Sequence, residues 1–178
     1  AQRSDRTMKP IVVIGAGGHA LVVADALIAA GAEVIGFTDA DASKRDLRPC
    51  GLPVLGEDAA VLAGYRPDAV LLANGIGGIK NTDVRRSLQM RLEAQGWNFA
   101  TVKHPSAIVS PNAHLGDGVQ LMAGSIVQPA AVIGTGSIIN TGAIIEHDVH
   151  VGDYVHIAPR AVLCGFVKVD SCSHIGAG

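Results

Sequence analysis

His147 is the histidine whose surroundings best suit catalysis, because it lies between two carboxylates, Glu146 and Asp148. A carboxylate beside an imidazole fixes the tautomer of the ring and raises its basicity, which a general base requires. Gly165 follows eighteen residues later; a glycine there leaves room for a substrate and offers a backbone N–H to a developing oxyanion. The alternative for His147 is an ordinary solvated turn residue.

A second candidate site is the glycine-rich segment Gly15–Ala20 (G-A-G-G-H-A). Such glycines let backbone N–H groups approach a phosphate at the start of a helix, where the helix dipole favours negative charge. Asp39 stands where a ribose-binding acid is expected in dinucleotide-binding folds. The surrounding region has only about 95 residues, so one nucleoside diphosphate fits better than NAD. A glycine turn without a ligand is the alternative.

A strict six-residue period in the second half of the chain decides where these side chains point. Its hydrophobic positions are Val109, Leu115, Leu121, Val127, Ile133, Ile139, Ile145, Val151, Ile157, Leu163, Val169 and Ile175. This period predicts a parallel β-helix of hexapeptide repeats, with three hexads in each coil. His147 then lies at a corner, with Gly165 beside it in the next coil. The same register places His114, His150, His156 and His174 on flat faces, pointing outward.

The first half alternates between strand-like and helix-like segments, which indicates a small three-layer α/β domain with a parallel sheet. We expect strands at 10–14, 33–37, 69–73 and 97–102, and helices at 20–30, 57–63 and 81–95. A boundary near His104–Pro105 divides the chain into an α/β domain, 8–104, and a β-helix domain, 105–178. The last hexad stops after four residues, so we expect the β-helix to be incomplete at its C-terminal end; the alternative is that a partner covers that end.

Composition narrows the possible partners. The net charge is −2, which argues against nucleic acid and against an anionic membrane surface, because both attract clustered Lys and Arg. Three cysteines without zinc-type spacing indicate a reduced, cytoplasmic protein, and the histidine spacings predict no metal site. No segment is long and apolar enough to span a bilayer. The polar residues 1–7 are interpreted as a processing remnant.

Several motifs together carry a family resemblance. They are I-G-A-G-G-H-A at 14–20, G-F-T-D at 36–39, K-H-P-S-A at 103–107, N-T-G-A-I-I-E-H-D at 140–148 and H-I-A-P at 156–159, followed by Gly165. With this set the chain resembles the bacterial sugar O-acyltransferases related to sialic acid O-acetyltransferases. Close relatives of that family are the sugar-nucleotide N-acetyltransferases of the bacillosamine and perosamine type.

The resemblance implies a homotrimer of left-handed β-helices, each with an N-terminal nucleotide-sugar domain. Acetyl-CoA would be the donor, bound between adjacent subunits. By the same resemblance His147 is the general base, Asp148 orients it, Gly165 polarises the thioester carbonyl, and His156 lies near the thioester in the acetyl-CoA site. The residues it assigns to the nucleotide sugar are Gly17, Gly18, His19 and Asp39, with Asn140 as a further substrate contact.

These expectations lead to one preferred activity and three alternatives. The preferred activity is transfer of acetyl from acetyl-CoA to the amino group of a nucleotide-linked 4-amino-deoxysugar, for surface glycan biosynthesis. The alternatives are O-acetylation of a sialic-acid-like sugar, a non-catalytic nucleotide-binding trimer, and a nicotinamide-dependent oxidoreductase. A hydroxyl acceptor would depend on a histidine base more strongly than an amine does, because a neutral amine is already nucleophilic.

Overall fold

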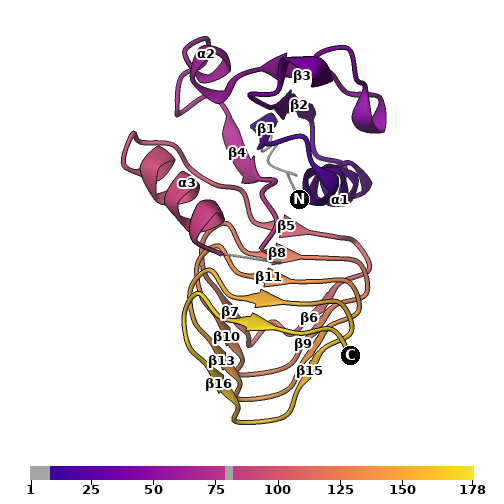
Figure 1. The fold of residues 1–178 in the computed structure, drawn as a ribbon. Helices are drawn as coiled ribbons and strands as arrows, with labels where there is room; N and C mark the ends of the chain where they lie inside the picture. Colours follow the sequence, from indigo (N-terminus) through magenta and orange to yellow (C-terminus); the bar gives the residue numbers. More distant parts are fainter. Residues whose placement is uncertain (1–8, 79–81) are drawn as a thin grey trace, which may run out of the picture.

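The computed structural model describes residues 9–78 and 82–178 of the chain. Residues 1–8 and 79–81 lie outside the described residues. They include the polar residues 1–7 and the first residue of the helix expected at 81–95. The described chain forms a small α/β domain seated on one side of a triangular β-helix (Figure 1).

The α/β domain is built around one four-stranded parallel sheet with the order β3-β2-β1-β4. The strands are β1 (Ile11–Ile14), β2 (Val34–Thr38), β3 (Val54–Gly56) and β4 (Leu71–Asn74). The helices are α1 (Gly18–Ala29), α2 (Asp58–Leu62) and α3 (Asp83–Glu93), with short 3₁₀ turns η1 (Ala42–Lys44) and η2 (Pro49–Gly51). Because β1 is apolar and buried throughout, it lies inside the sheet between β2 and β4, where both faces are covered.

Two expectations about this domain were wrong in detail. Strand β3 was not expected, because three residues, of which only Val54 is apolar and buried, give no periodic signal. The strand expected at 97–102 is reduced to a single parallel bridge between Leu72 and Phe99. After that bridge the chain leaves the α/β sheet, since β5 (Val102–Lys103) pairs with a strand of the β-helix.

The β-helix consists of two-residue strands separated by turns, and strands eighteen residues apart pair in parallel register. One sheet holds β6 (Ile108–Val109), β9 (Ile126–Val127), β12 (Ile144–Ile145) and β15 (Val162–Leu163). The second holds β7 (His114–Leu115), β10 (Val132–Ile133), β13 (His150–Val151) and β16 (Lys168–Val169). The third holds β5, β8 (Gln120–Leu121), β11 (Ile138–Ile139), β14 (His156–Ile157) and β17 (His174–Ile175).

The predicted inward positions form the β-helix core. The buried cluster joins the second strand residues, such as Leu121 and Ile145, with the small residues four positions later, such as Ala143 and Val149. At a turn between successive strands the backbone enters the left-handed region every sixth residue from Gly118 to Cys172. Glycine occupies most of the early positions, whereas later ones carry side chains, among them Asp148 with φ 58°. Asp tolerates this conformation better than most residues.

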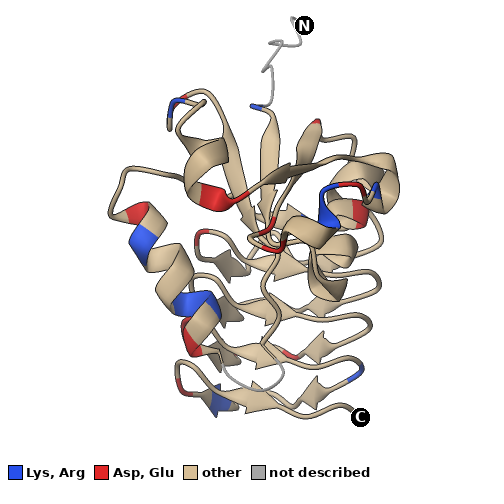
Figure 2. Cartoon of the chain, turned by 45° about the horizontal axis from the view of Figure 1, so that its top comes forward, with Lys and Arg blue, Asp and Glu red and all other residues tan. Residues whose placement is uncertain are grey.

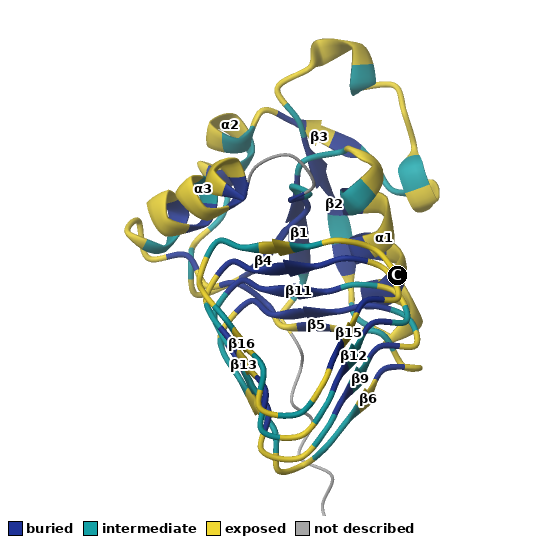
Figure 3. Cartoon of the chain, turned by 60° about the horizontal axis from the view of Figure 1, so that its bottom comes forward, coloured by how far each residue is buried: buried dark blue, intermediate teal, exposed yellow. Residues whose placement is uncertain are grey.

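The three outer faces of the β-helix differ in character. The domain face, formed by β5, β8, β11, β14 and β17, lies against the α/β domain, so its central strands are deeply buried (Figure 3). The aliphatic face presents Ile108, Ile126, Ile144 and Val162, stacked in register. The polar face presents His114, Val132, His150 and Lys168. The hexad register therefore predicted the outward histidines correctly, while the α/β domain buries one of them, His156.

Acidic and basic residues alternate over the helices and turns and are not gathered into one patch in the view of Figure 2. Within residues 9–78 and 82–178, no helix is long and apolar enough to cross a membrane. All three cysteines are free thiols. The division of the chain near residue 104 stays a prediction; β5, just before it, already belongs to the β-helix.

Candidate active site

His147 and Asp148 form a hydrogen-bonded pair at the corner between the aliphatic and polar faces. The His147 Nδ1 lies 2.9 Å from the Asp148 Oδ2. Because an ionised carboxylate can only accept, the ring carries its hydrogen on Nδ1 and leaves the Nε2 lone pair free. The left-handed backbone at Asp148 turns its side chain back onto the preceding residue. The pair therefore has the geometry of an oriented general base.

Gly165 lies directly beside the imidazole, one coil further on. A Cβ added to Gly165 would stand 2.8 Å from His147 Cε1 and 2.9 Å from Nε2, closer than real side chains pack. The Phe166 N–H donates to the His147 carbonyl, whereas the Gly165 N–H makes no hydrogen bond within the described chain. A free N–H next to the base is the arrangement that an oxyanion requires.

This corner is open to solvent in the single chain. The side chains of His147 and Asp148 are 54% and 45% exposed. The Phe166 ring stands edge-on to the imidazole with centroids 5.4 Å apart, and Phe166 is 70% exposed. A large apolar ring beside a polar pair on an open corner suits a surface that another molecule covers.

Asn140 and His156 form a separate pair, on the domain face. Asn140 Nδ2 donates to His156 Nε2 at 3.0 Å, and Asn140 Oδ1 accepts from the Thr141 N–H. His156 is 3% exposed because the loop at Gly78 covers it. Burial lowers the pKa of the imidazole, so it is neutral. Its Nδ1 has no hydrogen-bond partner, although the Gly78 backbone lies alongside.

The glycine loop lines a cleft of about 600 Å³ together with Asp39, Lys44 and the segment Gly75–Gly77. Helix α1 begins at Gly18, two residues earlier than expected, so His19 lies in its first turn. No side chain caps the helix N-terminus, and Cβ atoms added to Gly17 or Gly18 would meet nothing within 4 Å. The first-turn N–H groups therefore face open space, which suits an anion.

Asp39 fixes the glycine loop and is itself held as an anion. Its Oδ2 accepts from the Ala16 N–H at 3.1 Å and from Lys44 Nζ at 2.7 Å. Desolvation on its own would raise the pKa of this carboxyl, but the hydrogen bonds from Lys44, Asp41 and Ala16 outweigh it and lower the pKa. The ion pair leaves the ribose-binding position charged and places an ammonium at the edge of the cleft.

His19 connects the cleft with the β-helix. Its Nε2 donates to Gln120 Oε1 at 2.8 Å, and Gln120 Nε2 donates to the Asn74 carbonyl. Burial, together with the nearby charge of Arg85, lowers the pKa of His19 to about 4. The ring is therefore neutral at pH 7, and its Nδ1 remains an acceptor.

Sequence reasoning missed several residues of these sites. Lys44 and Gln120 carry no motif, and only the fold brings them to Asp39 and His19. Phe166 had a visible signal, since it follows Gly165 and an aromatic residue at a β-helix corner is unusual in a chain with 3% aromatics. The structure brings together His147, Asp148 and Gly165; Asn140 and His156; and Gly17, Gly18, His19 and Asp39. Their individual roles stay predictions.

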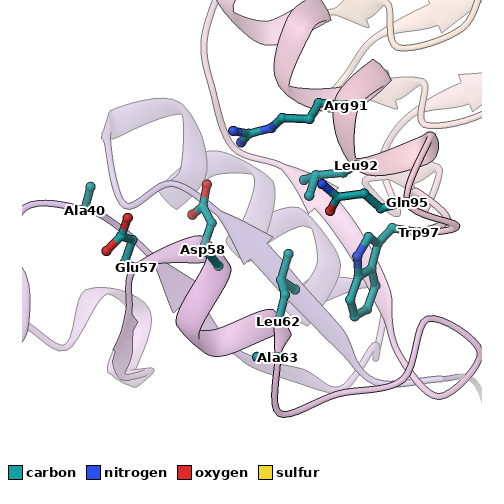
Figure 4. Close-up of a pocket in the computed structure, with 10 residues that line it drawn as sticks. Ala40, Glu57, Asp58, Leu62, Ala63, Arg91, Leu92, Gln95 and Trp97 are labelled. Carbon is teal, nitrogen blue, oxygen red and sulfur yellow. The ribbon is translucent and has the colours of Figure 1, made fainter.

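A second cleft, of about 440 Å³, lies between α2 and α3 (Figure 4). Arg91 and Gln95 stand across from Glu57 and Asp58, and Leu62 and Trp97 line its apolar part. Thr38 links it with the glycine loop, because its hydroxyl donates to Asp58 and accepts from the Gly15 N–H. Across the described residues, no cluster of three or more His, Cys, Asp or Glu side chains could hold a metal ion.

The fold and the corner pair define a two-part protein of the hexapeptide-repeat transferase class, with a nucleotide-type glycine loop on its first domain. Residues 10–92 match the PglD N-terminal domain family, and residues 112–147 match the bacterial transferase hexapeptide family. The acetyltransferase domain of PglB from Neisseria gonorrhoeae FA1090, solved with acetyl coenzyme A, has 34% identity and a TM-score of 0.87. That alignment covers 96% of this chain and 80% of the other.

Two further relatives are also N-acetyltransferases. A mutant perosamine N-acetyltransferase from Caulobacter crescentus, solved with CoA and GDP-perosamine, has 36% identity and a TM-score of 0.79 over 89% of this chain and 73% of that one. UDP-N-acetylbacillosamine N-acetyltransferase of Bacillus subtilis strain 168 is 39% identical over 118 residues, 65% of this chain and 52% of that protein. This chain belongs to the PglD-like hexapeptide acetyltransferase family, related to the bacillosamine and perosamine N-acetyltransferases. It spans about half the length of the curated relatives it matches.

Proposed function

We propose that the protein transfers acetyl from acetyl-CoA to the 4-amino group of a nucleotide-linked amino-deoxysugar. The observation that carries this proposal is the His147–Asp148 pair stacked on Gly165, with a free Nε2 and a free N–H on the same corner. The related structures contain acetyl coenzyme A in one case, and CoA with GDP-perosamine in the other. Both ligand classes suit the two candidate sites of this chain.

In the proposed reaction the sugar amine attacks the thioester carbonyl carbon. The new C–N bond forms while the carbonyl π electrons move to oxygen, and the Gly165 N–H stabilises that oxyanion. His147 Nε2 takes the proton that the amine loses, and Asp148 stabilises the resulting imidazolium. Collapse of the intermediate breaks the C–S bond, and the imidazolium proton goes to the departing CoA thiolate.

The glycine-loop cleft would hold the nucleotide. Free N–H groups at the start of α1 suit the diphosphate, and Asp39 suits a ribose hydroxyl after exchange of its contact with Lys44. Asn140 and His156 lie on the domain face and are proposed to contact the sugar and the acetyl-CoA end, respectively. An expected cytoplasmic location stays a prediction.

We further propose that the active corner is completed by neighbouring copies in a homotrimer. Ile108 and Val162 on the aliphatic face are 64% and 53% exposed, although β-branched aliphatic residues in a solvated sheet normally alternate with polar ones. This stripe ends at the corner that carries His147 and Phe166. A second copy covering the stripe would also close the acetyl-CoA site.

The activity is tested by thiol release from acetyl-CoA with UDP-linked and GDP-linked 4-amino sugars as acceptors. We expect His147→Ala to lower kcat by roughly a hundredfold, while the control His150→Ala, exposed on the polar face three residues later, retains the wild-type rate. Turnover only with a sialic-acid-like hydroxyl acceptor would replace the proposal by O-acetylation. Nucleotide binding without thiol release would indicate a non-catalytic trimer.

The assembly is tested by sedimentation with Val162→Glu, which places a charge on the aliphatic stripe without touching the core. We expect monomers and lost acetyl transfer, whereas His150→Glu on the polar face keeps the wild-type mass. A trimer that tolerates Val162→Glu would locate the subunit contact elsewhere.

A further inference from the structure

Arg85 is a buried arginine at the junction of the two domains. It lies on α3 and is 1% exposed. Its Nη1 donates to the carbonyls of Asn74 and Ile76, at 3.0 and 2.9 Å, and its Nε donates to the Gly136 carbonyl at 3.1 Å. Asn74 is the last residue of β4, and Ile76, two residues later, lines the glycine-loop cleft. The guanidinium therefore stands directly behind one wall of that cleft.

The charge of Arg85 has no carboxylate partner among the described residues. Its three acceptors are neutral carbonyls, and its Nη2 is buried without any hydrogen bond. Burial lowers the pKa of Arg85 to about 9, so the guanidinium still carries its charge at pH 7. A buried charge without a counter-ion costs free energy, and an anion bound nearby would offset that cost.

The field of this charge reaches the histidines of both sites. Burial is the main cause of the lowered pKa of His19, in the cleft, and of His156, on the domain face, and the charge of Arg85 adds to it in both. The same field must favour an anion in the cleft, because the separating material is protein and not water. The start of α1 at the glycine loop supplies further positive potential in the same cleft, whereas the charge of Lys44 is paired with Asp39.

We propose that Arg85 is a positioning residue of the nucleotide cleft, whose uncompensated buried charge and two carbonyl contacts favour binding of the diphosphate group of the nucleotide sugar. The inference rests on the proposed function, because it assumes that the cleft takes a nucleoside diphosphate. Arg85 does not touch the ligand; it acts through the wall formed by Asn74–Ile76. A bound diphosphate would supply the negative charge that Arg85 lacks among the described residues.

The test compares ligands with and without charge. Affinities of UDP, GDP, uridine and guanosine are measured by NMR titration on the full chain and on Arg85→Met, Arg85→Lys and Arg86→Met. A unit charge within roughly 10 Å at an effective dielectric constant of about 20 alters the binding of one opposite charge by about tenfold. We therefore expect Arg85→Met to weaken the preferred diphosphate at least tenfold, and its nucleoside less than about twofold.

The other two variants separate charge from packing. Arg85→Lys keeps the charge, so we expect diphosphate affinity within about threefold of wild type. Arg86→Met removes a neighbouring charge from the exposed side of α3, and we expect no change in binding. Equal weakening of nucleoside and diphosphate by a folded Arg85→Met would mean a purely structural role and overturn the inference, as would wild-type diphosphate affinity in that variant.

A second readout covers the case in which Arg85→Met fails to fold. Arg85→Lys then decides the matter: a folded Lys variant that binds the nucleoside normally and loses the diphosphate overturns the inference. In a folded Arg85→Met the His19 imidazole signals should also titrate at higher pH than in wild type, whereas in Arg85→Lys, which keeps the charge, they should titrate as in wild type. If wild-type protein binds neither UDP nor GDP, the proposed function fails together with the inference. If wild-type protein binds one of them but the affinities of the variants differ from those expected, only the inference fails.

Discussion

Gly165→Ala is the most direct test of the corner geometry. The new Cβ would stand 2.8 Å from His147 Cε1, 2.9 Å from Nε2 and 3.3 Å from Nδ1. Carbon atoms pack without strain at about 3.5 Å, so the imidazole must move by roughly 0.7 Å or rotate away. Either movement disturbs the 2.9 Å hydrogen bond to Asp148 and displaces Nε2 from the attacking amine.

The magnitude follows from the displacement. A shift approaching 1 Å in a reacting group costs up to about a hundredfold in rate, and loss of the oriented base costs about as much. We expect kcat to fall by about tenfold to a hundredfold. Stability should change by less than about 0.5 kcal/mol, because the residues around the new methyl group are solvent-exposed and can adjust. Alanine keeps the backbone N–H, so the oxyanion donor is unaffected chemically.

The assay is steady-state thiol release with saturating acetyl-CoA, combined with a thermal melt of each variant. Gly176→Ala is the matched control, because its added Cβ would meet nothing within 4 Å. If Gly165→Ala retained the wild-type kcat with unchanged stability and molecular mass, the imidazole stacked on Gly165 would not be the group that takes the proton.

Three further predictions concern the α/β domain. The pKa of His19 is lowered to about 4 in the folded state, against 6.5 in the unfolded state. Between these pH values the unfolded chain binds more protons than the folded one. The free energy of unfolding therefore falls as pH drops from 6.5 to about 4, by about 3 kcal/mol in total. His19→Gln should remove this pH dependence in urea unfolding at pH 7.5 and 4.5, and an unchanged slope would contradict the buried, neutral ring. The pKa of Asp39 is lowered from its ordinary value of 3.8, so its contribution to stability is present above pH 3.8 and is lost as pH falls through the lower folded value. Asp39→Asn should therefore flatten the acid limb of the same curve; equal acid limbs would contradict the ion pair with Lys44. Gly75→Ala would place a Cβ 2.6 Å from both Ala20 Cβ and the Ile14 carbonyl oxygen. It should therefore destabilise the domain by about 1–3 kcal/mol and weaken nucleotide binding. Unchanged stability by calorimetry would mean that α1 and β4 are less tightly packed than this contact implies.

Much of the fold could be predicted from the sequence because its periodicities are local. Inward residues such as Leu121 and Ile145 recur every six positions, and this spacing alone decides that residues eighteen apart lie side by side. The pairing of His147 with Asp148 and its contact with Gly165 follow from that register. The helices and main strands of the first domain were predicted for the same reason. The short β3 was not predicted, and the strand expected at 97–102 is only a single bridge.

The sequence by itself thus determined the β-helix, its corner pair and the glycine loop, because each depends on residues close in the chain or separated by a fixed repeat. Only the tertiary structure decided how the two domains meet. The burial of His156, the hydrogen bond from His19 to Gln120 and the contact of Arg85 with Gly136 join segments with no common period. They depend on the packing of an α/β domain against one of three faces that share the same repeat, and the hexad repeat does not distinguish which face becomes covered.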